Sequence, residues 1–410
     1  MPNRRAPLEG IRIVDFSWVI AGPLTSKWLA LHGAEVIKIE SARDRGDVVR
    51  TDPGPSAGKQ GNPNTGGAFS NLNPNKLSLA LNMQQERARD IVRRLIKVSD
   101  VVLNNFAPGV MDKWGLTYEE MRAVNPSIIA VSMPAMGATG PRRHFRGLGS
   151  YFQAMAGLDV MIGYPHREIV DMGFAFPDAT CNPAHAAVAI LAALRHRNRT
   201  GEGQCIELRQ FESTINFLGT APLDYSVNRN VQMRTGSRAG YAAPHGVYRC
   251  AGDDRWCAIT VLSDQEWRSF CGAIGHPDWI EDPRFSTLLA RKAHEDLLDS
   301  LINEWTGDRS AEVVMDHLQA HGVPAGVVQH AGDLLEHDPQ IAHRGFYVTL
   351  DHPEGGRMVH EGASFQLSKT PAEFRTPAPL LGQHNDYVLQ TVLGMSEEEV
   401  DQCILDQAVM

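Results

Sequence analysis

The side chain best suited to covalent chemistry in this sequence is that of Asp178. It lies in residues 174–180, directly before a stretch with the pattern of a long helix. The dipole and free N–H groups at a helix N-terminus favour the ionised form of a nearby carboxylate. Such a carboxylate, when no cation pairs with it, can attack an activated acyl carbon. The position also suits a capping or near-capping aspartate, so the residues alone leave both interpretations open.

Motifs for several other kinds of chemistry are missing. The connection at residues 17–23 holds one glycine and a tryptophan, where a dinucleotide-binding turn needs GxGxxG. The sequence also lacks a GxxxxGK(S/T) phosphate loop and a GxSxG nucleophile elbow. Its 16 histidines and 6 cysteines form no HExxH or CxxC pattern. We therefore predict neither a bound metal nor a permanently bound cofactor.

The composition is that of a globular chain of 410 residues, with 43% hydrophobic and 21% charged residues. A formal net charge of -9 argues against a general nucleic-acid binder, which would need a basic surface. The longest apolar runs are far shorter than the roughly 20 residues of a membrane span. No apolar signal region follows residues 1–5, and the scattered cysteines suit a reducing compartment. We expect a cytoplasmic protein without a membrane or nucleic-acid partner.

The elements that must position Asp178 alternate between strand and helix. Apolar runs typical of buried strands occupy residues 11–16, 35–40, 100–103 and 128–132. Helical patterns lie between them at residues 22–32, 84–98 and 117–124. This alternation predicts an α/β fold with a parallel sheet covered on both faces. Residues 41–75 are rich in Gly, Pro and Asn and are expected to form a long functional loop.

The longest helix is predicted over residues 183–197, immediately after Asp178. Proline suits the first helical position, which assigns Pro183 to the helix start. The helical period predicts a buried stripe of Ala187, Ile190, Leu191 and Leu194.

The pattern of predicted elements changes near Tyr225. Strand-like segments at residues 247–250 and 256–261 and helical segments at 264–274 and 291–305 predict a smaller α+β domain over 235–325. The large domain is expected over residues 1–224, including a first linker from about 200, and again over 329–410. Residues 236–240 suit either a mobile lid over a reactive centre or a simple linker.

Several segments together resemble the class III coenzyme A transferases, the carnitine-dehydratase/bile-acid-inducible or formyl-CoA transferase family. The matching stretches, in the family's order, include residues 7–15, 21–23, 33–40, 46–50, 105–109, 174–180, 200–204 and 379–384. The resemblance implies a Rossmann-like open parallel sheet in the large domain, a small domain between two linkers, and an interlocked homodimer.

The resemblance also implies a mechanism. Asp178 would attack an acyl-CoA thioester to give an aspartyl anhydride, and coenzyme A would convert this to an aspartyl-CoA thioester that activates a carboxylic acid. Coenzyme A is then a substrate, expected to contact Val19, Ile20, Ala21, Asn105, Phe106 and Ala107, with Lys113 near its phosphates.

Some residues depart from the family pattern. Ser41 stands where formyl-CoA transferases carry a phosphate-binding arginine, and Arg43 or Arg45 could substitute. Gln84 replaces a lysine. The apolar side chains assigned to the acyl site are those of Trp18, Ile20, Tyr151, Phe152 and Met155. They indicate an acid larger than formate or oxalate, such as a dicarboxylic or aromatic acid.

Two alternatives remain open from the sequence. An α-methylacyl-CoA racemase shares the fold and the coenzyme but needs a His/Asp pair beside the α-carbon, and residues 143–145 do not reproduce the racemase histidine segment. The other alternative is a non-catalytic subunit that pairs with an active homologous chain.

Overall fold

The computed structural model describes residues 6–41, 46–50, 62–173 and 175–410. The chain divides into two compact units. The first unit contains Met1–Leu158, Asp171–Pro222 and Ile341–Met410, and the second contains Asp159–Val170 and Leu223–Gln340. Three stretches of chain that are far apart in sequence therefore build the first unit.

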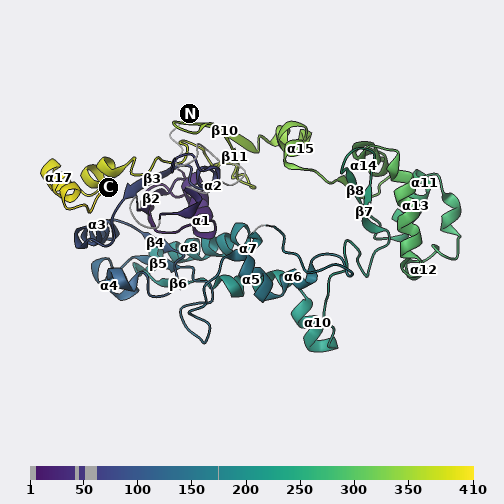
Figure 1. The fold of residues 1–410 in the computed structure, drawn as a ribbon, viewed down its shortest axis with the longest axis horizontal. Coiled ribbons are helices and arrows are strands. Elements are labelled where there is room, and N and C mark those ends of the chain that lie inside the picture. The colour runs from purple at the N-terminus through teal and green to yellow at the C-terminus, as the bar shows by residue number, and fades with distance from the viewer. Residues whose placement is uncertain (1–5, 42–45, 51–61, 174) are drawn as a thin grey trace. The chain divides into compact units, whose positions relative to one another are not determined.

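The first unit is organised around a six-stranded parallel sheet with the strand order β3-β2-β1-β4-β5-β6 (Figure 1). Its strands are β1 (Arg12–Asp15), β2 (Glu35–Glu40), β3 (Lys76–Ala80), β4 (Val101–Asn104), β5 (Ile129–Ser132) and β6 (Cys205–Glu207). The chain reverses its direction of progress across the sheet between β1 and β4. At such a point the loops at the carboxyl ends of the two strands diverge and leave a crevice. The predicted α/β class is confirmed.

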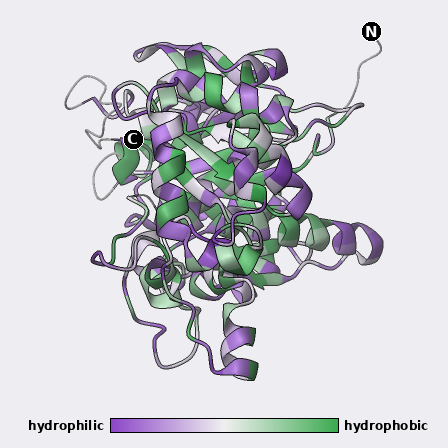
Figure 2. Cartoon of the chain, turned by 90° about the vertical axis from the view of Figure 1, so that its right-hand side faces the viewer, coloured by the Kyte–Doolittle hydropathy of each residue, from purple (hydrophilic) through white to green (hydrophobic). Residues whose placement is uncertain are grey.

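The sheet is buried on both faces, which explains why its strands read as continuous apolar runs. On one face, Ile13, Val36 and Val101 pack with residues of α1 (Ala21–Leu31) and α8 (Cys181–Thr200). On the other face, the next residue of each strand packs against α3 (Glu86–Lys97) and α4 (Tyr118–Val124). Figure 2 shows helices that carry both hydrophilic and hydrophobic residues, as amphipathic covering helices do.

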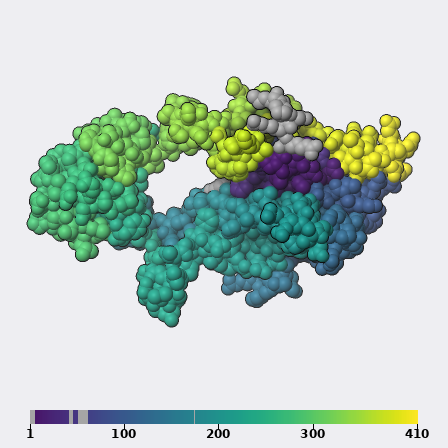
Figure 3. Space-filling view, turned by 180° about the vertical axis from the view of Figure 1, so that it is seen from behind, coloured from purple at the N-terminus to yellow at the C-terminus, as the bar shows by residue number. Residues whose placement is uncertain are grey.

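The C-terminal part of the chain returns to the N-terminal sheet. The π-helix η5 (Tyr387–Val392) and α17 (Glu397–Leu405) contribute Val388, Leu389 and Val400 to the same core as α3. Beyond α17, the amide of Met410 donates to the carbonyl of Ala80 at 3.1 Å. The space-filling view accordingly shows C-terminal residues in yellow beside N-terminal residues in purple (Figure 3).

The remaining elements of the chain complete the two units. The second unit contains the antiparallel sheet of β7 (His245–Arg249), β8 (Trp256–Thr260) and β9 (Ala325–Val327). Its helices are α11 (Asp264–Ala273), α12 (Leu288–Ala293), α13 (Glu295–Gly307), α14 (Ala311–Ala320) and α15 (Ala331–Glu336). The other elements of the chain are η1 (Val48–Arg50), α2 (Gly67–Leu72), η2 (Asp112–Trp114), α5 (Gly149–Ala156), α6 (Leu158–Met161), α7 (Phe176–Ala179), α9 (Gln210–Ile215), η3 (Asn216–Leu218), α10 (Ala221–Asn228), η4 (Pro277–Ile280), α16 (Pro339–Arg344), β10 (Tyr347–His352) and β11 (Gly356–Glu361).

Several sequence-based predictions need correction. Helix α8 begins two residues before Pro183, so this proline is the third helical residue and not the first. The buried stripe of α8 includes Ala186 and Ala193, whereas Leu191 is 44% exposed. The single helix expected at 291–305 is the pair α12 and α13. The expected loop at 41–75 contains helix α2, because Phe69 and Leu72 find a buried setting.

A search of the described helices for one long and apolar enough to cross a bilayer finds none.

Candidate active site

Asp178 lies in the short helix α7, which packs against α1, α5, α8 and α9. Its side chain is buried, with 6% of the residue exposed. It does not cap α8, whose N-cap position is Thr180 and lacks a side-chain capping hydrogen bond. The capping interpretation of Asp178 is therefore wrong, and the burial of its carboxylate needs another explanation.

Two hydrogen-bond donors hold the Asp178 carboxylate. The Asn182 side chain, one turn further along, donates from Nδ2 to Oδ1 at 3.1 Å. The backbone N–H of Gly149, the first residue of α5, also donates to the carboxylate. A Cβ atom at position 149 would lie 2.6 Å from Oδ2, so only glycine lets the α5 backbone approach this closely. The helix N-terminus that contacts Asp178 is thus that of α5, although the sequence pointed to α8.

Burial dominates the electrostatics of Asp178. Desolvation raises the pKa of its carboxyl from 3.8 to about 6, and the hydrogen bonds from Asn182 and Gly149 act in the opposite direction. Within the described part of the chain, no cationic side chain lies within ion-pair distance of Asp178. The group is therefore ionised at neutral pH, shielded from water, and not neutralised by a partner.

The turn after β1, residues 17–20, is held rigidly from three sides. The Asn105 side chain accepts from the Trp18 amide at 2.9 Å and donates to the Trp18 carbonyl at 2.8 Å. Lys38 donates to the Ser17 carbonyl at 2.6 Å, and the Val19 amide donates to Asp47 at 3.0 Å. Val19 has φ 67°, a left-handed conformation that is strained for a β-branched residue. Such strain persists only where the surroundings impose it.

Buried ion pairs supply the rigidity beneath this turn. Lys38 pairs with Asp47 at 3.2 Å, and both side chains are shielded from solvent. Lys76 pairs with Asp15 at 3.3 Å in the same buried region, and Asp15 also accepts from Ser26 at 2.6 Å. Sequence reasoning missed these residues as part of the site. The signal was available, since charges at Asp15 and Lys38 interrupt otherwise apolar strands.

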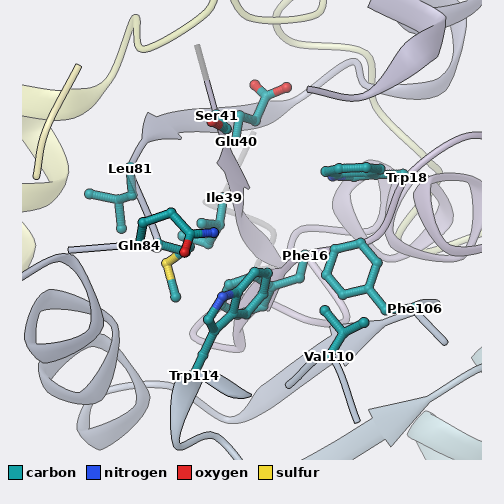
Figure 4. Close-up of a pocket in the computed structure, with 11 residues that line it drawn as sticks. Phe16, Trp18, Ile39, Glu40, Ser41, Leu81, Gln84, Phe106, Val110 and Trp114 are labelled. Carbon is teal, nitrogen blue, oxygen red and sulfur yellow. The ribbon is translucent and has the colours of Figure 1, made fainter. Parts of the chain in front are cut away.

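A cavity of about 520 Å³ opens at the carboxyl ends of β1, β2, β3 and β4 (Figure 4). Its lining residues are Phe16, Trp18, Ile39, Glu40, Ser41, Leu81, Met83, Gln84, Phe106, Val110 and Trp114. Trp18 meets Phe106 edge-on with ring centroids 5.2 Å apart, and Phe106 meets Trp114 at 5.9 Å. The arrangement forms an aromatic wall opposite the polar side chains of Ser41 and Gln84.

The structure brings together only part of the predicted coenzyme A contacts. Phe106 lines the cavity, and the turn that carries Val19 and Ile20 adjoins it through Trp18. Ala107 lines a different, smaller cavity of about 210 Å³, and Ala21 is buried as the first residue of α1. Lys113 is exposed beside the lining residue Trp114.

Other predicted residues are dispersed. Arg43 and Arg45 lie outside the described residues. Of the apolar side chains assigned to the acyl site, only Trp18 lines the 520 Å³ cavity. Phe152 is buried in the fold, whereas Tyr151 is 63% exposed. The assignment of the other side chains to an acyl site therefore stays a prediction.

Residues 236–240 belong to the second unit and are anchored there. The Gly236 amide donates to the Gly163 carbonyl at 2.8 Å, and Arg238 pairs with Asp296 and Asp299 at 2.6 Å each.

In the first unit, the exposed ring of His144 accepts from Arg143 at 2.9 Å. Among the residues that the structure describes, no group of three or more His, Cys, Asp and Glu side chains could hold a metal ion.

Comparison with known proteins decides the family. The model of CoA-transferase family III matches residues 8–385, nearly the whole chain. The chain belongs to CoA-transferase family III. A succinyl-CoA–D-citramalate CoA-transferase of Chloroflexus aurantiacus is 32% identical over 96% of both chains. A formyl-CoA:oxalate CoA-transferase of Streptomyces coelicolor is 31% identical, covering 96% of this chain and 97% of its own.

A solved structure extends the likeness to the fold. The CAIB/BAIF family protein of Brucella suis superimposes with a TM-score of 0.85 and 30% identity, covering 95% of this chain and 100% of that one. The family membership makes this protein an enzyme, a CoA-transferase.

Proposed function

We propose that this CoA-transferase moves coenzyme A from an acyl-CoA donor to a carboxylic acid larger than formate or oxalate, with Asp178 as the covalent nucleophile. The observation that carries the proposal is the state of Asp178. Its carboxylate is buried, ionised at neutral pH and without a cationic partner among the described residues. Carboxylates in such settings serve as nucleophiles toward activated carbonyl groups, provided water is excluded.

The proposed reaction proceeds through four attacks with no net change in protons or electrons. A carboxylate oxygen of Asp178 attacks the donor thioester and expels coenzyme A thiolate, which leaves an aspartyl–acyl anhydride. The thiolate attacks the aspartyl carbonyl, releases the donor acid and forms an aspartyl-CoA thioester. The acceptor carboxylate then expels the thiolate and forms a second anhydride. A final thiolate attack on the acceptor's acyl carbon releases the new acyl-CoA and regenerates Asp178.

Coenzyme A is proposed to bind along the carboxyl edge of the sheet, where open α/β sheets take their ligands. The aromatic wall of Trp18, Phe106 and Trp114 suits the flat adenine ring of the coenzyme. The rigid turn at residues 18–21 and the segment 105–107 are proposed to contact the rest of the molecule. Exposed Lys113, on η2, is proposed to approach its phosphates.

The size of the acceptor acid is not decided by similarity, since the relatives' names include both oxalate and citramalate. The proposal of a larger acid rests on departures from the family pattern in the sequence, where the bulky Ile20 is assigned to the acyl site and Gln84 replaces a lysine. A panel of acids with succinyl-CoA as donor tests it. Turnover of dicarboxylic or aromatic acids is expected, and exclusive turnover of oxalate or formate would refute it.

Trapping the intermediate tests the covalent role. Incubation with succinyl-CoA and hydroxylamine should convert Asp178 to a hydroxamate that peptide mass spectrometry locates. Asp178→Ala should reduce transfer by more than about 100-fold while coenzyme A binding persists. If Asp178 stays unmodified, a non-catalytic subunit role is favoured. If α-hydrogen exchange into acyl-CoA occurs without transfer, a racemase is favoured instead.

We further propose a cytoplasmic homodimer. The six cysteines are all free thiols, in keeping with a reducing compartment.

The proposal of a dimer rests on α8, where Val188 is 67% exposed and Leu191 is 44% exposed, although both are aliphatic. Exposed apolar side chains that cluster on one helix indicate a surface covered by another chain. A homologous subunit in place of a second copy is the alternative.

A further inference from the structure

A chain of buried amide side chains leads away from Asp178. Asn182 Nδ2, on α8, donates to Asp178 Oδ1 and also to Gln210 Oε1, at 3.1 Å each. Gln210 Nε2, on α9, donates in turn to the Met133 carbonyl at 2.7 Å. Asn182 is fully buried and Gln210 is 6% exposed. The chain therefore connects the carboxylate with the backbone that follows β5.

The backbone carbonyl fixes the direction of every hydrogen bond in this chain. The Met133 carbonyl can only accept, so Gln210 must present its NH₂ group there and its oxygen toward Asn182. Asn182 must then present its own NH₂ group to Gln210, and the second hydrogen of that group points to Asp178. Asp178 thus always faces a donor, which is the arrangement that an ionised carboxylate requires.

We propose that Asn182 and Gln210 are positioning residues, which orient the Asp178 carboxylate for attack and keep it in its ionised form. The proposal rests on the nucleophilic role of Asp178 proposed above. Neither amide side chain is proposed to touch the substrate. They act through Asp178, because an isolated amide at position 182 could rotate and offer its oxygen, which would repel the carboxylate.

The surroundings offer no competing charge. The titratable side chains on the helices packed against α7 are Lys27 on α1, Tyr151 on α5, Glu212 on α9, and Cys181, His185, Arg195, His196, Arg197 and Arg199 on α8. None lies within ion-pair distance of Asp178, and none contributes to its pKa, which burial, Asn182 and Gly149 determine. A substitution of Asn182 should therefore change the pKa of Asp178 directly.

A second polar contact between the same helices provides a matched control. One turn along, the His185 ring and the Ser213 hydroxyl lie 2.7 Å apart. Ser213 is 5% exposed, comparable with Gln210, but its contact does not involve Asp178. If the amide chain merely joined α8 to α9, the loss of either contact would have equivalent consequences.

The first test needs no substrate. The melting temperatures of the protein and of Asp178→Asn are measured from pH 4 to 9. Their difference stops growing at the pH where Asp178 of the folded protein is half ionised, and this pH is taken as the midpoint of its titration. In an Asn182→Leu background this midpoint should move up by about one pH unit, since a hydrogen bond to a charged group is lost. Gln210→Leu should give a smaller shift in the same direction, and Ser213→Ala should give none.

The second test uses transfer from succinyl-CoA to the best acceptor of the wild-type enzyme. Asn182→Leu should lower kcat by roughly 10-fold or more at pH 6 and by less at pH 9, with little change in KM. An unshifted midpoint in both amide variants, or equal shifts in Ser213→Ala, would overturn the proposal. If Asn182→Leu does not fold, Gln210→Leu decides by the same criteria.

The two proposals can fail separately. If the midpoint shifts as expected but no hydroxamate forms on Asp178, the covalent mechanism is wrong and the positioning role of Asn182 and Gln210 is retained. If a hydroxamate forms on Asp178 but the midpoint does not shift, the covalent mechanism is supported and the positioning role is wrong.

Discussion

At the scale of single residues, the cost of keeping Asp178 ionised is central. A carboxylate loses hydration when it is buried, and two hydrogen bonds restore only part of it. The protein tolerates this at Asp178, where the neighbouring Gly149 has no side chain to occupy the space. The role proposed for Asp178 and the stability of the fold are therefore opposed at this residue.

This opposition has a measurable sign. The folded pKa of Asp178 is about 6, above its ordinary value of 3.8. Below pH 3.8 the buried carboxyl is protonated and carries no charge to desolvate. As the pH rises from 3.8 through 6, the group ionises and stability is lost. Asp178→Asn removes the titration. The variant should be more stable than wild type by about 3 kcal/mol at pH 7.5, from 1.36 kcal/mol per pH unit, and about equally stable at pH 4. Denaturant unfolding at both pH values checks this, and equal stability at pH 7.5 would contradict it.

At the scale of elements, the turn between β1 and α1 is the feature that depends most on its neighbours. Three separate segments hold residues 17–19: the strand β2 through Lys38, the segment before η1 through Asp47, and the end of β4 through Asn105. The turn can therefore keep a strained residue, Val19, directly after Trp18, which lines the cavity. Rigidity there lowers the entropy lost when a ligand binds.

The ion pair beneath the turn should matter more than its surface counterparts. Asp47→Asn leaves the fully buried Lys38 ammonium without its carboxylate partner, which should cost about 3 to 5 kcal/mol of unfolding free energy. The control is Asp406→Asn, because the pair of Asp406 with Arg87 is 41% exposed on both sides and should contribute no more than about 1 kcal/mol. Equal losses in urea unfolding of the two variants would contradict the argument.

At the scale of the whole molecule, the first unit is assembled from three separate stretches of chain. Its C-terminal stretch supplies Val388, Leu389 and Val400 to the core that packs on one face of the sheet, so that core combines residues from both ends of the first unit. The dimer proposed above would cover the exposed aliphatic residues on α8.

Association is tested by mass. Light scattering after size exclusion should give twice the 45.1 kDa of one chain. Leu191→Glu places a charge on the proposed interface and should raise the dissociation constant of the dimer by 10-fold or more, which corresponds to at least about 1.4 kcal/mol. A wild-type mass of one chain at micromolar concentration would contradict the dimer.

The sequence by itself determined the α/β class, most strands of the parallel sheet and the residue to examine. Parallel strands that are buried on both faces must be short apolar runs, and the segments around β1, β2, β4 and β5 carry that pattern without help from the rest of the chain. Asp178 could be singled out because a carboxylate before a long helix is a local feature.

Only the tertiary structure decided what surrounds that carboxylate. Its donors come from α5 and α8, and the amide chain reaches across 28 and then 77 positions of sequence to Gln210 and Met133. Helix-forming and strand-forming patterns act over a few residues, whereas hydrogen bonds and burial act between groups that folding brings together. For the same reason the sequence assigned Leu191 to the interior and did not identify Asp47 and Lys38 as supports of the turn.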